Sequence, residues 1–446
     1  MGAMATEANA GGSARPGVTA ISARLPGGDF AALAVAVGWL VVLTALALRR
    51  LVVSLDTMSN YAHVWWVAQQ LREGHGLPFR MPVLGHGRAL TFPYAFVPWT
   101  LAALAWPLVG EHSVSIAIAL GGAATLFATF YAFPELRRGW WAAVTMANPL
   151  LIMAPLAGQL PFLWAIAALL AAIGAWRRGH RVVAILLAAI AQGTHAIIVG
   201  PMTGLLVVWW LLYETDRREL MKAYVLSVLV AIPALAVVVA SPISADVSLM
   251  TTVASFLETL LARSFVIVVP VTLVWMQRSH RPQMARRSLG PALLALAVVA
   301  NLSLLWPLQL MEGWRSLSRR PDQTVANFAR SPSFTAGATY RILRAGDAKV
   351  GMYQLLRAGA HLDSELFPES IVRRSWTSLD SYARFLKRRH VDRVIVFSSY
   401  DRGFRTNEHR LLSELASATC GAGGLTARLD HTGQGFEVYS IAPALC

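Results

Sequence analysis

Apolar stretches long enough to cross a lipid bilayer follow one another along most of this chain. They fall at about residues 30–48, 95–110, 113–133, 140–157, 159–176, 181–197, 198–213, 221–240, 253–276 and 289–310. A helix of roughly 20 apolar residues spans the hydrocarbon core of a bilayer. Lipid offers no hydrogen bonds, so a segment in that core must satisfy its backbone groups as a helix or a closed barrel. The pattern therefore predicts a polytopic α-helical membrane protein with about 9–11 transmembrane helices.

The composition indicates lipid surroundings as well. Of the 446 residues, 56% are hydrophobic and only 14% are charged, whereas soluble domains carry about 25% charged residues. The net charge is +15, but the basic residues stand in short clusters between apolar segments. That distribution is typical of the cytoplasmic loops of membrane proteins. We therefore expect the lipid bilayer as a partner and no nucleic acid.

Four basic clusters set the expected orientation. They are Arg137-Arg138, Arg177-Arg178 with Arg181, Arg217-Arg218 with Lys222, and Arg278 to Arg287. Two apolar segments separate each cluster from the next, so each pair of segments forms a hairpin, and the positive-inside rule places all four clusters in the cytoplasm. Residues 1–28 are predicted to be a disordered cytosolic N-terminus, followed by an uncleaved anchor. These features predict a multi-pass protein of the inner (plasma) membrane, with residues after about Glu312 outside.

Two apolar segments are not simple spans. The segment 95–110 is short and contains Pro98 and Pro107. We interpret it as a re-entrant or partly embedded helix, which leaves about nine full spans; the alternative is about ten, with Arg137-Arg138 outside. The stretch 181–213 is too short for two complete spans, so its helices are expected to be short, tilted or broken.

The chain changes character after the transmembrane domain, which is predicted to cover residues 29–311. Residues 312–446 are charged and carry alternating apolar runs at 339–343, 394–397 and 436–441, with helical patterns at about 379–389 and 407–418. Alternation favours half-buried strands. We predict a small extracytoplasmic α/β domain. Cys420 and Cys446 lie in it, and both a disulfide and two unpaired thiols remain open.

The external loop 49–94 contains most of the polar candidates. Its glycines and prolines exclude one long helix and predict a folded cap, whose first part, about 60–74, reads as a short amphipathic helix. Its charged and histidine side chains are Asp56, His63, Glu73, His75, Arg80, His86 and Arg88. Aromatic rings among carboxylates and arginines suit the binding of a sugar or a phosphate.

Asp56 is the strongest single candidate. It stands a few residues beyond the first apolar stretch, where a membrane helix meets water, and an ionisable residue at such a place marks a functional site. The alternative is that Asp56 caps a helix that starts at Thr57. The two roles can coexist, and Asp56 is external under both span counts.

The order of these features resembles the GT-C superfamily of integral-membrane glycosyltransferases. The residues that carry the resemblance are Asp56, His63, Ala68, Leu71, Gly74 and Gly76-Leu77-Pro78, then the entry Phe92-Pro93-Tyr94 into the next segment. The resemblance implies transfer of a sugar from a polyprenyl-phosphate carrier to a glycan or glycolipid acceptor of the cell envelope, on the outer face and with inversion. It implies that Asp56 is the catalytic base or a ligand of a divalent metal, Mg²⁺ or Mn²⁺; metal dependence is left open.

The remaining candidates serve substrate binding. A lipid-linked phosphate needs positive partners, and histidines can donate hydrogen bonds or ligate a metal. The candidates for binding the phosphate are Arg80, Arg88 and Arg263, and those for hydrogen bonding are His63, His75 and His86. The candidates for lining a cavity are Gln159 and His195. Glu111 is the candidate for a second external acid. His195 is alternatively a satisfied core residue, and Glu111 a charge at a helix start. Asp246 and Glu258 are further acids.

Two other classes of protein are weighed against the enzyme. A transporter or flippase of a lipid-linked or small polar substrate also fits broken helices and buried polar residues. Transporters, however, commonly consist of two halves that are related in sequence, and no internal repeat is found in this chain. A noncatalytic scaffold with a partner-binding tail predicts a plainer first loop.

Overall fold

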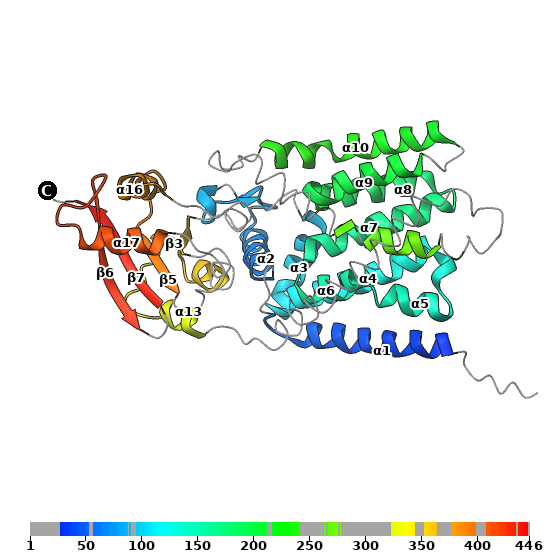
Figure 1. The fold of residues 1–446 in the computed structure, drawn as a ribbon, viewed down its shortest axis with the longest axis horizontal. Coiled ribbons are helices and arrows are strands. Elements are labelled where there is room, and N and C mark those ends of the chain that lie inside the picture. Colours follow the sequence, from blue (N-terminus) through cyan, green and yellow to red (C-terminus); the bar gives the residue numbers. More distant parts are fainter. Residues whose placement is uncertain are drawn as a thin grey trace, which may run out of the picture.

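A computed structural model gives the fold. It describes residues 27–52, 57–87, 89–90, 95–211, 216–240, 260, 263–264, 266–274, 277, 323–343, 352–363, 376–397, 407–433 and 436–444. The described chain is mostly helical and ends in a small mixed sheet (Figure 1). The helices lie side by side in a bundle, and the C-terminal region, residues 323–444, lies beyond one end of it.

The bundle contains eight of the described helices, and they run roughly along one direction (Figure 1). They are α1 (Gly27–Leu48), α4 (His112–Ala132), α5 (Gly139–Met146), α6 (Pro149–Leu156), α7 (Leu160–Arg177), α8 (Arg181–Thr194), α9 (Ala196–Trp210) and α10 (Arg217–Ala240). Within the described residues, α1, α4 and α7 are long and apolar enough to cross a membrane. These three helices are consistent with the expected membrane association.

Close packing between α4 and α7 forms the centre of the bundle. The Thr125 hydroxyl lies 2.8 Å from Gly121 O and 2.9 Å from Leu163 O, which links the two helices, and Trp164 Nε1 donates to Ala117 O at 3.0 Å. Gly174 has the Tyr131 ring against it. Small residues let helices approach closely, and interhelical hydrogen bonds add to the packing.

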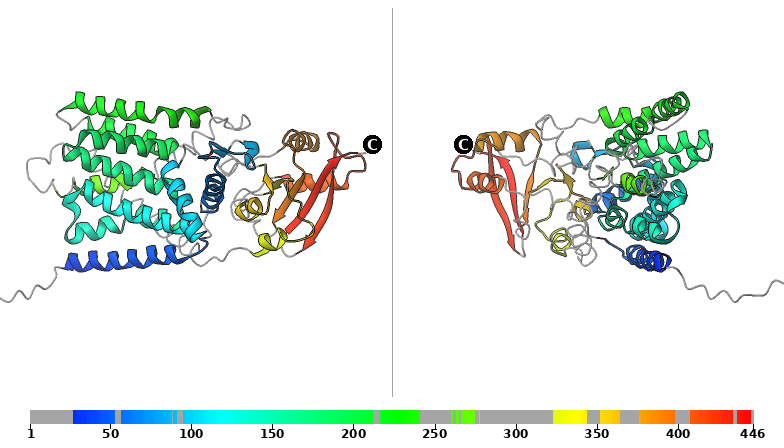
Figure 2. Two further views of the ribbon diagram at one scale, coloured as in Figure 1. Left: turned by 180° about the vertical axis from the view of Figure 1, so that it is seen from behind. Right: turned by 45° about the vertical axis from the view of Figure 1, so that its right-hand side comes forward.

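Three of the four basic clusters meet at one end of the bundle. Asp29, near the start of α1, accepts a hydrogen bond from Gly139 N at 2.7 Å. Arg177 pairs with Glu135, and Leu220 packs with Trp176. The fourth cluster, residues 278–287, lies outside the described residues. We call the end of the bundle at which these three clusters lie the basic end. The opposite end, where the C-terminal region lies, is the tail end (Figure 2).

Two predicted segments are each divided. The segment 140–157 becomes α5 and α6, because Asn148 caps α6 by accepting from Leu150 N at 3.1 Å, with Pro149 in the first turn. The stretch 181–213 becomes α8 and α9, which have 14 and 15 residues and meet at His195. The prediction of short, broken helices for that stretch is confirmed.

The helices α2 (Thr57–Arg72) and α3 (Phe96–Val109) lie at the tail end. The helix predicted for the external loop corresponds to α2, but α2 is not amphipathic as expected, because its residues from Thr57 to Val64 are buried on more than one face. Ala95 N, just before α3, donates to Thr194 O at 3.0 Å, and Glu111, just after α3, pairs with Arg50 at 3.1 Å. Both ends of α3 therefore lie at the tail end, which is the geometry expected of a re-entrant or partly embedded segment.

The C-terminal region contains a five-stranded sheet in the order β4-β3-β5-β7-β6. Its strands are β3 (Thr339–Ile342), β4 (His361–Leu362), β5 (Arg393–Phe397), β6 (Leu425–Gly433) and β7 (Phe436–Pro443), and its helices are α13 (Gln323–Phe328), α16 (Leu379–Arg388) and α17 (Glu408–Ser417). β3 is parallel to β4 and β5, and β7 is antiparallel to β5 and β6. The three predicted strands and two predicted helices are present, and β4 and β6 are additional.

The external loop joins the edge of this sheet. Its own strands, β1 (Arg80–Met81) and β2 (Ala89–Leu90), are antiparallel. Between them, Leu84 forms a parallel bridge with Leu362 of β4, and Leu362 N donates to Val83 O at 2.8 Å. The loop 49–94 and the C-terminal region are therefore in direct backbone contact.

Candidate active site

Asn60 attaches α2 to the tail end of the bundle. Its side chain is 2% exposed. Its Nδ2 donates to Gly158 O, in the turn between α6 and α7, and its Oδ1 accepts from Trp99 Nε1 of α3, both at 2.9 Å. One amide thus satisfies a buried carbonyl and a buried indole N–H, which are costly to leave without partners. The start of α2 is fixed by this link.

His63 lies one turn further along α2 and stacks on Trp99, with ring centroids 4.3 Å apart. Its Nδ1 is 2.7 Å from Ser59 O. A carbonyl oxygen can only accept, so Nδ1 carries the proton. Burial lowers the pKa of His63 to about 4, so the ring is neutral near pH 7 and Nε2 is an acceptor. His63 Nε2 can therefore accept a hydrogen bond from a ligand hydroxyl or bind a metal ion, but it cannot donate a hydrogen bond to a ligand.

Two other predicted residues contact Phe162 of α7, and a third lies in the turn before that helix. Arg263 lies over the Phe162 ring at 5.1 Å, and the His195 ring meets it edge-on at 6.1 Å. Arg263 Nη1 is 3.4 Å from His195 Nε2. Gln159 directly precedes α7, and its Oε1 is buried without a hydrogen-bond partner among the described residues. An amide, an imidazole and a guanidinium thus line the helix breaks at the tail end.

Asp56 itself lies outside the described residues, as do Arg88, Asp246, Glu258 and Cys446. The peptide bond nevertheless joins Asp56 to Thr57, the fully buried first residue of α2. The helix start at Thr57 agrees with the predicted boundary, and both the catalytic and the capping role remain predictions.

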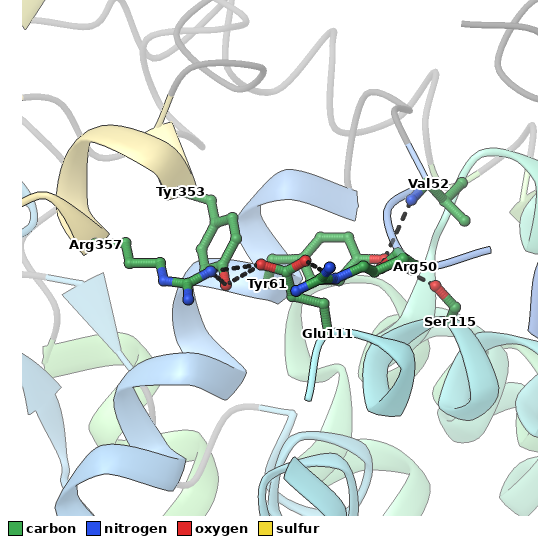
Figure 3. A network of polar contacts seen from close by, with 7 residues as sticks. All are labelled: Arg50, Val52, Tyr61, Glu111, Ser115, Tyr353 and Arg357. Carbon is green, nitrogen blue, oxygen red and sulfur yellow. Dashed lines mark hydrogen bonds and ion pairs between the residues drawn. The ribbon is translucent and has the colours of Figure 1, made fainter. Parts of the chain in front are cut away.

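The structure holds Glu111 and His86 in other contacts. Glu111 is at the N-cap position of α4 but makes no capping bond with its side chain; it binds Arg50, Tyr353 and Arg357 instead (Figure 3). His86 Nε2 is 3.1 Å from Asp363 Oδ1. Both residues therefore connect the bundle or the loop with the C-terminal region.

Asp363 is the fully buried centre of a charged cluster in the C-terminal region. Arg341 and Arg389 contact it at 2.8 and 3.1 Å, in addition to His86. Burial alone would raise the pKa of Asp363, but the His86 hydrogen bond and the two arginine charges outweigh burial and lower it. The carboxylate is therefore ionised and keeps His86 at the edge of the sheet.

His75 and Arg80 are not brought to the bundle. His75 is exposed and contacts Gln70 at 3.2 Å and Glu73 at 3.4 Å. Arg80 is exposed and donates to Gly87 O at 3.4 Å. Of the predicted binding residues that the structure describes, His63, Gln159, His195 and Arg263 form the group at the tail end.

Asn60 and Trp99 belong to this group, although the sequence did not single them out. A signal was present, because Asp56, Asn60 and His63 follow the i, i+4, i+7 spacing of one helix face. Trp99 had no such signal, since its role depends on α3 folding back against α2.

No set of metal ligands is found in the part of the chain that the structure describes, where no three or more His, Cys, Asp or Glu side chains are placed to hold an ion. Comparison with known proteins adds no assignment: no family model, no curated protein and no solved structure matches the chain.

Proposed function

We propose that this protein is a polytopic membrane glycosyltransferase of the GT-C type, which transfers a sugar from a polyprenyl-phosphate carrier to a cell-envelope glycan or lipid. The supporting observation is the fixed position of α2. The helix that begins directly after Asp56 is held by Asn60 against α3 and the α6–α7 turn, at the same end of the bundle as Gln159, His195 and Arg263. An arginine and neutral polar groups then lie at the end of the bundle where the helix that follows Asp56 begins.

The proposed reaction is a single displacement. Asp56 takes the proton of an acceptor hydroxyl as its oxygen attacks the anomeric carbon. The bond from that carbon to the phosphate oxygen breaks, and the polyprenyl phosphate leaves with the electron pair, which inverts the anomeric centre. The positive charge of Arg263 is suited to the leaving phosphate, and His63 Nε2 and Gln159 are suited to sugar hydroxyls.

The proposal includes an orientation in the inner membrane. The basic end faces the cytoplasm because of the positive-inside rule. The tail end, the external loop and the C-terminal region then lie outside, where lipid-linked sugars meet cell-envelope acceptors. About nine spans are proposed, with α3 as the segment that does not cross.

A transporter or flippase is the second candidate. It is favoured by the break between α8 and α9 at His195 and by the buried hydrogen bond of 2.9 Å from Gln192 to Ser227, which joins α8 and α10. Polar groups on broken helices inside a bundle are typical of transport pathways.

The test uses the full chain in liposomes supplied with a panel of polyprenyl-phosphate monosaccharides and a cell-envelope lipid extract. Asp56→Asn is expected to lower transfer by about 10²–10⁴-fold, the usual contribution of a general base. Asp216→Asn is the matched control, because Asp216 caps α10 at the basic end and asparagine caps equally well. Undiminished transfer by Asp56→Asn contradicts the mechanism. Passage of the lipid-linked sugar across the bilayer without transfer favours the second candidate.

A further inference from the structure

Four arginine side chains gather where α4 and α7 end, at the basic end of the bundle. Three of them donate to three successive carbonyls in the last turn of α4, namely Phe130 O, Tyr131 O and Ala132 O. The fourth donates to Trp176 O in the last turn of α7, at 3.2 Å. We call these residues the arginine cluster: Arg137, Arg178 and Arg177 on α4, in the order of those carbonyls, and Arg181 on α7.

Two members of the cluster lie over aromatic rings. The guanidinium carbon of Arg178 is 3.9 Å from the centroid of the Tyr131 ring, and that of Arg181 is 3.6 Å from the centroid of the Trp176 ring. Both arginines are exposed. Among the residues that the structure describes, their hydrogen bonds use Nη1 alone. A guanidinium has five N–H donors, so Arg178 and Arg181 are held in place and still have donors for a further partner.

The positive charge of the cluster exceeds the negative charge that the described residues place beside it. Glu135 pairs with Arg177. The carbonyl ends of α4 and α7 add about −0.5 elementary charge each. Four arginines, one carboxylate and two helix ends therefore leave an excess of about +2. Glu219 of α10, another acid at the basic end, binds Lys222 instead. The cluster therefore calls for an anion from outside the protein.

An apolar face of α8 begins directly after the cluster. Its side chains are between 43% and 70% exposed, and they belong to Val182, Val183, Leu186 and Ile190. Arginines at the end of a membrane helix place their charges at the level of the lipid headgroups, while apolar side chains further along lie among the acyl chains. A phospholipid has the same order of a charged phosphate and an apolar chain. A free phosphate would use the arginines alone, so the arrangement fits a lipid.

We propose that the arginine cluster binds the headgroup of an anionic phospholipid of the cytoplasmic leaflet, with an acyl chain along α8. The phosphate oxygens accept from the remaining N–H donors of Arg178 and Arg181, which are charge-assisted hydrogen bonds. Basic sites between membrane helices on the cytoplasmic side are suited to such headgroups. The choice of leaflet rests on the proposed orientation, and the site does not depend on the proposed sugar transfer.

The test follows the melting temperature of the full chain in neutral detergent as dioctanoyl phosphatidylglycerol is added. The measured quantity is the lipid concentration at half of the maximal shift. Arg178→Gln combined with Arg181→Gln is expected to raise this concentration by about 30-fold, since one basic side chain near an anionic surface contributes about fivefold. Arg384→Gln combined with Arg388→Gln is the matched control, because both arginines are exposed on α16 of the C-terminal region. The control is expected to change the concentration by less than about twofold.

A second variant separates the effect of charge from loss of folding. Glu135→Gln removes the acid that pairs with Arg177 and is expected to lower the half-maximal concentration by about fivefold, because the excess of positive charge rises. Damage to the fold would weaken binding rather than strengthen it. A double variant of Arg178 and Arg181 within about twofold of the unaltered protein overturns the proposal. Equal weakening in the control overturns it as well, and so does weaker binding by Glu135→Gln.

Two further ligands test the chemistry of the partner. Glycerol 3-phosphate has a phosphate without acyl chains, and dioctanoyl phosphatidylcholine has the acyl chains without the net charge. Neither is expected to reproduce the shift, and a shift of equal size with either one at the same concentration overturns the proposal. The assay contains no sugar donor. Lipid binding by a protein that transfers no sugar retains this inference and refutes the proposed function, and Asp56-dependent transfer without a response to phosphatidylglycerol does the reverse.

Discussion

Replacing Asn60 tests the link that fixes α2 to the bundle. Asn60→Ala removes two buried hydrogen bonds, one to the Gly158 carbonyl and one from the Trp99 indole N–H. Each loss costs about 1 kcal/mol where water takes the place of Asn60 and up to about 3 kcal/mol where it does not. The expected loss of stability is therefore about 2–6 kcal/mol. Asn60→Asp separates the two bonds, because it keeps an acceptor for Trp99 and places an oxygen opposite Gly158 O.

The assay is thermal denaturation of the purified protein in detergent, read together with transfer activity. Asn327→Ala is the matched control, because Asn327 is exposed and its truncation is expected to change stability by less than about 0.5 kcal/mol. Asn60→Asp is expected to destabilise the protein as well, since the donor to Gly158 is lost. An Asn60→Ala protein as stable as the Asn327→Ala protein would refute the argument that this amide holds α2.

Two further predictions concern stability. The pKa of His63 is lowered to about 4 in the folded protein, so the stability that the neutral ring contributes is complete above the unfolded pKa of about 6.5 and is lost as the pH falls towards 4. His63→Phe is therefore expected to reduce the loss of stability between about pH 7 and pH 5 by roughly 2 kcal/mol. Identical stability–pH profiles of the two proteins would contradict this. Gly174→Ala is expected to lower the stability by about 1–3 kcal/mol, because the added Cβ overlaps the Tyr131 ring and lies 3.1 Å from the Tyr131 carbonyl carbon. Gly38→Ala is the control and is expected to leave the stability unchanged, because nothing lies within 4 Å of its added Cβ. Equal melting temperatures of the two variants would contradict the prediction.

Hydrophobic periodicity made part of the fold predictable. Val394 and Ile395 are neighbours in β5 and face different apolar clusters, one with Leu386 and Leu415 and the other with Phe328 and Tyr340. Such alternation is visible in the sequence. The helix break at His195 was also predictable, because the stretch 181–213 is too short for two full spans.

The candidate site was predictable only in part. His63, Gln159, His195 and Arg263 were selected as polar residues in or beside apolar stretches, and the fold brings them to one end of the bundle. Glu111 and His86 were selected on the same grounds, yet their partners, Tyr353 and Asp363, are 242 and 277 residues away. The chain has 39 lysine and arginine residues, and nothing in their local sequence distinguishes Arg357 or Arg50 as a partner of Glu111.

The sequence by itself therefore determined the local elements: the apolar helices, the basic clusters between them, the helix α2 directly after Asp56, and the alternating strands of the C-terminal region. These follow from the spacing of apolar side chains, which is a property of adjacent residues. Only the tertiary structure decided that α3 packs against α2, that the external loop joins the edge of the sheet at Leu362, and that Tyr353 reaches Glu111. Those contacts depend on where distant segments meet, and a polar side chain acquires its partner only after the helices have packed.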